Sequence, residues 1–314
     1  MDCCDIVVVG SSAGGVRALQ TLFANLPGDL PAAVFVVQHT APDSPGMLPH
    51  LLGRSSALKV ATATDGERFL PSHAYIAPPD RHLLIERGHM HLSAGPKENR
   101  ARPAINPLFR SAAAAYGPRV AGVVLTGLLD DGTLGLWEIK RRGGVCIVQE
   151  PNDAEYYQMP ASAIRNVSVD YLIPLKEIGP RIVALAHEYT GPSSSHQEFS
   201  MASEATRLTC PECHGPLRRV HYGNAIELRC RIGHAYSPET ALVAHDEAEE
   251  RILWSAVEML EEGADFAELL CDAMPGMRTK IREKAAVKRD LAKRLRAKME
   301  AVVPGVLVPN DNGS

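Results

Sequence analysis

The feature that most constrains the fold is an alternation, between about residues 6 and 188, of short apolar runs with longer segments of helical spacing. Each short run is rich in β-branched residues at consecutive positions, which is typical of strands buried on both faces of a parallel sheet. Strands that alternate with helices predict an α/β domain with a doubly wound, mostly parallel sheet, in a Rossmann-like three-layer sandwich. We expect strands at 6–9, 33–37, 120–125 and 145–148, helices that include 16–26, 105–116 and 135–142, and a β-hairpin insertion or antiparallel edge within 65–92.

Beyond this domain the composition of the chain changes several times, and the changes predict its other parts. A stretch rich in Ser, Gly and Pro is typical of a linker, and a short segment with Cys and His pairs follows it. A long, charged stretch of helical spacing with a break at a Pro-Gly pair then predicts a helical hairpin. The expected parts are the α/β domain at 1–189, the linker at 190–206, the Cys/His segment at 207–237, the helical hairpin at 238–301 and a flexible tail at 302–314.

Composition narrows the class of protein. With 45% hydrophobic and 22% charged residues, the chain has an ordinary globular composition. Its net charge of −4 is too small to indicate nucleic acid or an anionic membrane as a general partner, and the basic run at 278–298 is typical of a solvated helix face. Since the N-terminus has no secretory signal and no apolar run approaches about 18 residues, we expect a cytoplasmic protein without membrane insertion. Seven scattered cysteines with one tight cluster indicate a reducing compartment and a metal site rather than disulfides.

The first expected strand leads directly into the sequence Gly-Ser-Ser-Ala-Gly-Gly at 10–15. Gly10, Ser12 and Gly14 match the G-x-S-x-G pattern, which holds a nucleophilic serine on a tight turn between a strand and a helix. The N–H groups at the start of that helix, beginning with Ala13, suit a developing oxyanion. The alternative is a phosphate-binding turn, but G-x-G-x-x-G is absent and no Walker lysine follows.

A histidine and an aspartate pair follow other strands of the same expected sheet. His39 ends the second strand, and Asp130 and Asp131 come just after the third. Because the carboxyl ends of parallel strands share one edge of a sheet, we expect these side chains to lie near Ser12. The set predicts a hydrolytic triad in which His39 is the base and an aspartate orients it. The alternatives are a histidine that only ends a strand, and an Asp-Asp-Gly turn in which one aspartate caps the next helix.

Several segments together resemble the catalytic domain of the CheB-type protein-glutamate methylesterases of chemotaxis, in the family's order and over about residues 6–188. They are residues 10–15, 38–39, 65–67, 74–78, 102–103, 125–132 and 159–160. The resemblance implies hydrolysis of glutamate methyl esters on chemoreceptors, or on similar signalling proteins, to glutamate and methanol, often with glutamine deamidation. It implies no cofactor for catalysis.

The resemblance also assigns residues. It makes Ser12 the nucleophile, His39 the base, and Asp131, rather than Asp130, the orienting aspartate. The oxyanion and substrate-binding residues that it implies are Ala13, Gly14, Leu128 and Met159, with Arg102 beside the active site.

Departures from the family pattern leave other functions open. Ala13 stands where chemotaxis members commonly carry Thr, and Leu128 and Leu129 make the expected pocket more apolar. An esterase or amidase with a substrate other than a chemoreceptor is therefore a second hypothesis, and a non-catalytic signalling protein is a third. Because the chain begins at the catalytic strand, we expect it to lack the receiver domain through which phosphorylation regulates the chemotaxis enzymes.

The Cys/His segment contains the pattern C-x2-C…C-x3-H, formed by Cys210, Cys213, Cys230 and His234. Two close ligand pairs separated by a hairpin-sized stretch predict a tetrahedral, structural zinc site of the zinc-ribbon kind. The metal would supply folding energy that so small a segment cannot obtain from its own core. Four protein ligands leave no open position for catalysis, and His214 and His221 are alternative ligands.

Overall fold

The computed structural model describes residues 5–187, 203–273 and 275–301, and the chain forms two compact units, Met1–Val243 and Ala244–Ser314. Most of the expected linker (190–202) and the whole expected tail (302–314) lie outside the described residues.

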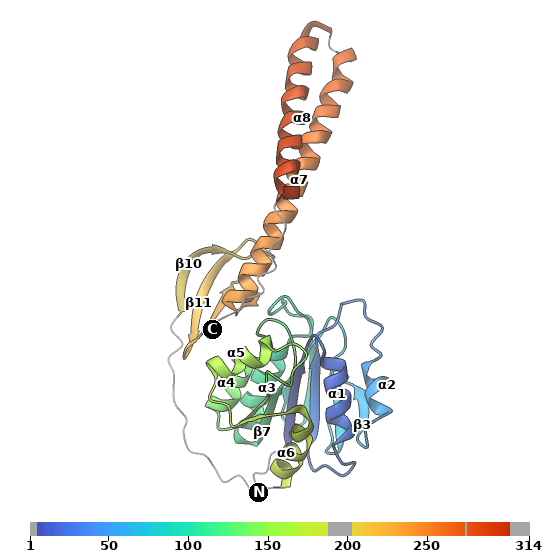
Figure 1. The fold of residues 1–314 in the computed structure, drawn as a ribbon, viewed down its shortest axis with the longest axis vertical. Helices are drawn as coiled ribbons and strands as arrows, with labels where there is room; N and C mark the ends of the chain where they lie inside the picture. Colours follow the sequence, from blue (N-terminus) through green and yellow to red (C-terminus); the bar gives the residue numbers. More distant parts are fainter. Residues whose placement is uncertain (1–4, 188–202, 274, 302–314) are drawn as a thin grey trace. The chain divides into compact units, whose positions relative to one another are not determined.

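The first unit contains a seven-stranded sheet in the order β3-β4-β2-β1-β7-β8-β9, and every pair of neighbours is parallel (Figure 1). The predicted doubly wound α/β fold is thus confirmed, and the four strands expected from the sequence are four adjacent strands of this sheet, β2, β1, β7 and β8. The other three strands are short and lie toward the edges. The bounds are β1 (Ile6–Ser11), β2 (Ala33–Gln38), β3 (Lys59–Thr62), β4 (His73–Ile76), β7 (Val120–Val124), β8 (Val145–Gln149) and β9 (Tyr171–Ile173).

Helices cover both faces of the sheet (Figure 1). Alternate residues of β1 enter different cores: Ile6 and Val8 pack with α3, α4 and α5, while Val7 and Val9 pack with α1, α2 and α6. This two-sided burial explains why the strand is apolar at consecutive positions. The helices are α1 (Gly15–Ala24), α2 (Leu48–Gly53), α3 (Ile105–Tyr116), α4 (Thr133–Arg141), α5 (Gln158–Asn166) and α6 (Leu175–His187).

The order of the strands places a switch point beside β1. The chain leaves β1 to build β2, β4 and β3 on one side, and it returns to build β7, β8 and β9 on the other. The carboxyl ends of β2, β1 and β7 are therefore neighbours, and ligands of open α/β sheets bind at such a point.

Two smaller antiparallel sheets complete the first unit. Strands β5 (His82–Glu86) and β6 (His89–Ser93) pair as the hairpin expected in this region. The Cys/His segment forms a four-stranded sheet in chain order, with β10 (Ser203–Thr209), β11 (Pro216–Tyr222), β12 (Ala225–Cys230) and β13 (Ala235–Tyr236).

The expected helical hairpin is also present, as α7 (Pro238–Ala273) and α8 (Arg278–Ala301). Within the second unit, Arg289 pairs with Asp265 and Glu268, and Arg296 pairs with Glu261, so charges of opposite sign join the two helices. Among the described residues, no helix has both the length and the apolar character that crossing a membrane requires.

Gly10 in β1 offers a test of how tightly the sheet packs on α3. A Cβ at this position would lie 2.4 Å from Cγ2 of the buried Ile105, so we expect Gly10→Ala to destabilise the fold by about 1–3 kcal/mol. Gly53→Ala in α2 is the matched control, because a Cβ there would meet only Val60 at 3.9 Å. The midpoint of urea unfolding checks both variants, and equal midpoints would contradict the packing described here.

Candidate active site

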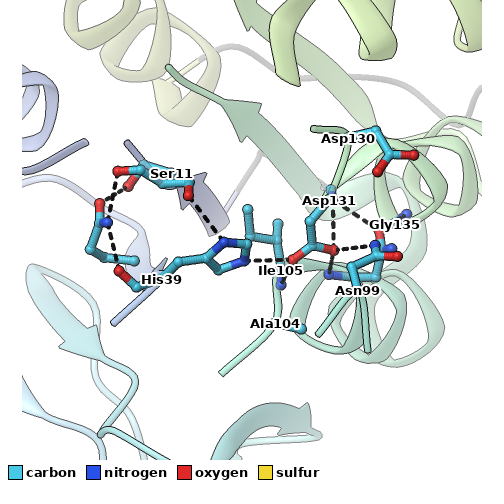
Figure 2. Close-up of polar contacts among 12 residues, drawn as sticks. Ser11, His39, Asn99, Ala104, Ile105, Asp130, Asp131 and Gly135 are labelled. Atoms are coloured by element: carbon cyan, nitrogen blue, oxygen red, sulfur yellow. Dashed lines mark hydrogen bonds and ion pairs between the residues drawn. The ribbon is translucent and has the colours of Figure 1, made fainter. Parts of the chain in front are cut away.

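The three residues of the predicted triad meet at the switch point of the sheet. Ser12 follows β1, His39 follows β2, and Asp131 lies in the turn after β7. The His39 ring lies between the other two side chains, with Nδ1 at 3.1 Å from Ser12 Oγ. Its Nε2 lies 2.8 Å from Asp131 Oδ2 (Figure 2). A continuous hydrogen-bonded chain therefore joins the hydroxyl to the carboxylate.

The charge of the carboxylate determines the protonation of the ring. An ionised carboxylate only accepts hydrogen bonds, so His39 Nε2 must carry the proton that it donates to Asp131. In the neutral ring, Nδ1 then has a free lone pair that faces the Ser12 hydroxyl. The arrangement can therefore take a proton from Ser12.

Asp131 is buried, with 2% of its surface exposed, and it accepts five hydrogen bonds. Burial by itself would raise the pKa of Asp131, but the hydrogen bond and charge of His39, and then the Ile105 N–H and the Asn99 amide, outweigh it, and the pKa lies below its usual value. Two of the donors are N–H groups at the start of α3, where the helix dipole favours negative charge. The donors are His39 Nε2 (2.8 Å), Asn99 Nδ2 (3.1 Å) and the N–H groups of Ile105 (2.6 Å), Asn106 (3.3 Å) and Gly132 (3.0 Å).

Ser12 lies on a tight turn that enters α1. Its N–H donates to the carbonyl of Thr126 at 3.0 Å, and the Gly15 N–H donates to the Ser12 carbonyl at 2.9 Å. Gly14 has a φ of 74°, a conformation that favours glycine. Within the part of the chain that the structure describes, no protein acceptor is hydrogen-bonded to the N–H groups of Ala13 and Gly14. Both groups are thus available to an oxyanion formed beside Ser12.

Gln38 is a supporting residue to which the sequence assigned no role, although it belongs to one of the segments that resemble the family. Its Nε2 donates to the carbonyls of Ser12 (2.8 Å) and His39 (2.9 Å), and its Oε1 accepts from the Ser11 hydroxyl at 2.8 Å. A Cβ at Gly15 would lie 2.0 Å from this oxygen, which explains a second glycine in the turn. The sequence does offer a signal for this role, because Gln38 is the one polar residue of the otherwise apolar strand β2.

Met159 and Leu128, predicted to bind substrate, differ in exposure. Met159 is buried, and its sulfur would lie only 2.1 Å from a Cβ atom placed on Gly127. That same Cβ would lie 2.9 Å from Ser12 Cβ, so Gly127 lets the two side chains approach. Leu128 is 45% exposed and presents an apolar surface to solvent. Their role toward substrate stays a prediction.

Arg102 is engaged in contacts with neighbouring loops. Its guanidinium donates twice to Asp80 Oδ1, at 2.8 and 2.7 Å, and to the carbonyls of Ala94 (3.0 Å) and Gly95 (2.8 Å). The guanidinium also lowers the pKa of Asp80 through this hydrogen bond. The contacts fix the loop that precedes α3, and a direct role in substrate binding stays a prediction.

Asp130 points away from His39, although it is the neighbour of Asp131 (Figure 2). Its Oδ1 accepts hydrogen bonds from the hydroxyls of Ser237 (2.8 Å) and Thr240 (3.1 Å), at the start of α7. Among the described residues, neither aspartate side chain accepts an N–H group within α4, the helix after them. Asn106 Oδ1 instead accepts the Gly135 N–H at 2.8 Å, and it shares the Gly132 N–H, just before that helix, with Asp131 Oδ1.

Asn99 is a second residue that the sequence analysis did not single out. Its Nδ2 donates to Asp131 Oδ1 at 3.1 Å, and its Oδ1 accepts from the Ser237 N–H at 3.0 Å. Its own N–H donates to the carbonyl of Ala235 at 2.8 Å. Asn99 has a φ of 46°, in the left-handed region that Asn tolerates better than most residues. Nothing in the local sequence signals this role, because its partners are remote in the chain.

The four predicted metal ligands form one cluster, in which all ligand atoms lie within 4.8 Å of one another. The Cys210 and Cys230 sulfurs lie 3.7 and 3.6 Å from His234 Nδ1, and the Cys213 and Cys230 sulfurs are 3.6 Å apart. Bonds of about 2.3 Å to sulfur and 2.0–2.1 Å to nitrogen in a tetrahedron separate ligand atoms by about 3.5–3.8 Å. The cluster therefore fits a metal ion. His214 and His221 are not members of it.

The burial of Asp130 predicts a pH-dependent stability. Burial, opposed by the Ser237 hydroxyl and assisted by the charge of Glu239, raises the pKa of Asp130 from 3.8 to about 6. The folded protein therefore holds this proton more tightly than the unfolded chain, and stability is lost as pH rises from about 4 through about 6. Asp130→Asn, which is neutral at every pH, should match the parent protein near pH 3 and exceed its stability at pH 7.5 by up to about 3 kcal/mol. Urea unfolding at both pH values checks this, and a constant difference would contradict it.

Comparison with known proteins gives the family. The model of the CheB methylesterase family matches residues 7–182. A Methanosarcina mazei protein named protein-glutamate methylesterase/protein-glutamine glutaminase 2 is 39% identical over 58% of this chain and 52% of its own length. A Leptospira interrogans relative is 37% identical over 58% of this chain and 94% of its own length. The crystal structure of the Thermotoga maritima CheB methylesterase catalytic domain is 37% identical, with a TM-score of 0.56, and the match covers 58% of this chain and 98% of that one.

The matched region is the α/β domain with the candidate active site, while the Cys/His cluster and the helical hairpin lie outside residues 7–182. The chain spans about half the length of the Methanosarcina relative and nearly all of the Leptospira relative. The resemblance on which the sequence analysis relied is confirmed. The chain belongs to the CheB methylesterase family.

Proposed function

We propose that this protein is a serine hydrolase that removes methyl groups from glutamate methyl esters on a chemoreceptor or a similar signalling protein, releasing methanol. The observation that carries the proposal is the hydrogen-bonded chain Ser12–His39–Asp131, with a carboxylate whose surroundings keep it ionised. Membership of the family and the names of the relatives support the choice of substrate. A receptor substrate of this kind would place the reaction in the cytoplasm.

The first half of the reaction forms an acyl-enzyme. Ser12 Oγ attacks the ester carbonyl carbon while His39 Nδ1 takes the hydroxyl proton, and Asp131 stabilises the imidazolium that results. The oxyanion of the tetrahedral intermediate would accept hydrogen bonds from the free N–H groups of Ala13 and Gly14. The bond to the methoxy oxygen then breaks, and His39 returns the proton to the departing methanol.

The second half releases glutamate. Water attacks the acyl carbon, His39 Nδ1 takes its proton, and the proton passes to Ser12 Oγ as the acyl bond breaks. The same steps with an amide would deamidate glutamine and release ammonia, and the relatives' names include this activity. Exposed Leu128 and the methyl side chain of Ala13 favour one alternative, an apolar ester on another protein.

We also propose that the metal of the Cys/His cluster is zinc, with a structural role in a zinc-ribbon-like segment. Three sulfurs and one imidazole nitrogen are a ligand set that zinc prefers, and four protein ligands leave no position open for substrate. The ligands lie in two turns at the open end of the β11–β12 hairpin, around Cys210–Cys213 and Cys230–His234, so the metal would join these turns.

Removal of the nucleophile or the base should abolish hydrolysis. We expect Ser12→Ala and His39→Ala to lower methanol release from methylated chemoreceptor by at least about 10³-fold, because each removes a group that the transition state needs. Ser11→Ala is the matched control, since within the described part of the chain the Ser11 hydroxyl donates to Gln38 and bonds to no member of the predicted triad, and its activity should stay within about tenfold. Near-normal turnover by either of the first two variants would contradict the triad. If a phosphonate labels Ser12 but the protein releases no methanol from the chemoreceptor, the result would favour the alternative ester substrate.

The metal proposal predicts a stoichiometry. Chain purified without chelator should contain about one zinc ion per molecule, and Cys213→Ala should lose it together with stability of the Cys/His segment. His214→Ala is the matched control, because this neighbour lies outside the cluster and should keep the metal. Elemental analysis by mass spectrometry measures both, and zinc retained by the first variant or lost by the second would contradict the ligand set.

A further inference from the structure

The Cys/His segment packs on the α/β domain next to the candidate active site, within the unit Met1–Val243. The Trp137 and Tyr222 rings meet edge to face, with centroids 5.5 Å apart. Arg110 of α3 pairs with Glu98 at 2.5 Å and lies 4.0 Å from the buried Glu227 of β12. The packing therefore combines apolar and charged contacts, and it brings β13 alongside the loop that contains Asn99.

A short route of contacts leads from the metal cluster to this loop. The residue after the ligand His234 is Ala235, whose carbonyl accepts the Asn99 N–H at 2.8 Å. The next residue, Tyr236, is buried and its hydroxyl lies 3.4 Å from the sulfur of Cys210, another ligand. Ser237 then donates its N–H to Asn99 Oδ1 at 3.0 Å. Ala235 and Ser237 therefore hold the backbone and the side chain of Asn99, while Tyr236 between them contacts a ligand.

Asn99 passes this restraint to the triad. Its amide donates to Asp131 Oδ1, the oxygen that does not contact His39, and so helps the N–H groups of Asn106 and Gly132 to fix the rotation of the carboxylate. With that rotation fixed, Oδ2 is aimed at His39 Nε2 (Figure 2). The amide also helps to keep the pKa of Asp131 low.

A second connection runs through Asp130, the residue before Asp131. Asp130 accepts the hydroxyls of Ser237 and Thr240, and Ser237 Oγ also accepts the Thr240 N–H at 3.0 Å. The segment that follows the last metal ligand is thus hydrogen-bonded to both members of the aspartate pair, to one directly and to the other through Asn99.

We propose that Asn99 is a positioning residue through which the Cys/His segment aligns the triad, so that metal bound at Cys210, Cys213, Cys230 and His234 raises the rate of hydrolysis. The proposal rests on the proposed function of the site. Small Cys/His segments gain their folding energy from the metal. Loss of the metal would loosen the Ala235–Ser237 contacts, and Asn99 would no longer hold the Asp131 carboxylate in one rotation.

The test uses the full zinc-loaded chain and two variants of one residue. Asn99→Gly accepts the same φ without strain and removes both side-chain hydrogen bonds. Asn99→Asp keeps an oxygen for the Ser237 N–H but replaces the donor to Asp131 with a repelling carboxylate oxygen. We expect kcat to fall by about 10- to 100-fold in both, with KM nearly unchanged. Lys97→Ala, two residues away, is the control and should retain the parent kcat.

Removal of zinc then tests whether the coupling passes through Asn99. Stripping zinc with a chelator should lower kcat of the parent chain by about tenfold, and readdition should restore it, while the same treatment of Asn99→Gly should change kcat by less than about twofold. Equal losses in the two proteins would overturn the proposal. If circular dichroism shows that stripping unfolds the α/β domain, the zinc-loaded Asn99→Asp variant decides, and a parent-like kcat overturns the proposal.

A readout that does not depend on turnover separates this proposal from the proposed function. In protein labelled with ¹⁵N in its histidine rings, the His39 Nε2–H proton hydrogen-bonded to Asp131 reports the alignment directly. We expect its NMR signal to shift or broaden in Asn99→Asp and after zinc removal, but not in Lys97→Ala. An unchanged signal in the first two overturns the coupling even if the esterase is active. A changed signal in a protein that hydrolyses no ester supports the coupling and rejects the proposed function.

Discussion

A buried carboxylate organises the edge of the sheet at which the candidate active site lies. Asp131 has almost no contact with solvent, and an ionised group in such a place is costly unless several donors surround it. The donors come from the end of β2, the start of α3, the Asn99 loop and the turn after β7. Because each donor stabilises the same charge, these four segments are held in one arrangement, and the position of His39 follows from it.

Glycines at three positions let the side chains around Ser12 and His39 pack closely. Gly10 leaves room for Ile105 at the start of α3, and Gly127 leaves room for both Ser12 and the buried Met159. Gly15 leaves room for Gln38, which in turn holds the carbonyls on either side of the Ser12–His39 contact. The serine and the histidine are therefore positioned by backbone contacts, while the carboxylate is positioned by hydrogen-bond donors.

The aspartate pair divides two tasks between neighbouring residues. Asp131 faces the histidine, whereas Asp130 faces the hydroxyls at the start of α7. The family match covers residues 7–182, so the partners of Asp130 belong to a part of the chain that the family does not describe. Attachment of that part at a residue adjacent to the predicted triad is the physical basis of the proposed coupling between the Cys/His cluster and the candidate active site.

The sequence by itself determined the four central strands of the sheet, the residues at its edge and the Cys/His cluster, because each has a local signature. Consecutive apolar residues marked the strands β2, β1, β7 and β8, and the spacing of Cys and His identified the four members of the cluster. Only the tertiary structure decided which contacts the aspartates make and how the Cys/His segment meets the α/β domain. Nothing local in the sequence shows what Gln38, Asn99 and Ser237 support, since their roles depend on hydrogen bonds to partners that are 26, 32 and 107 or more residues away in the chain. A polar side chain becomes a support only when the fold brings its partner within about 3 Å, and one-dimensional spacing does not encode that distance.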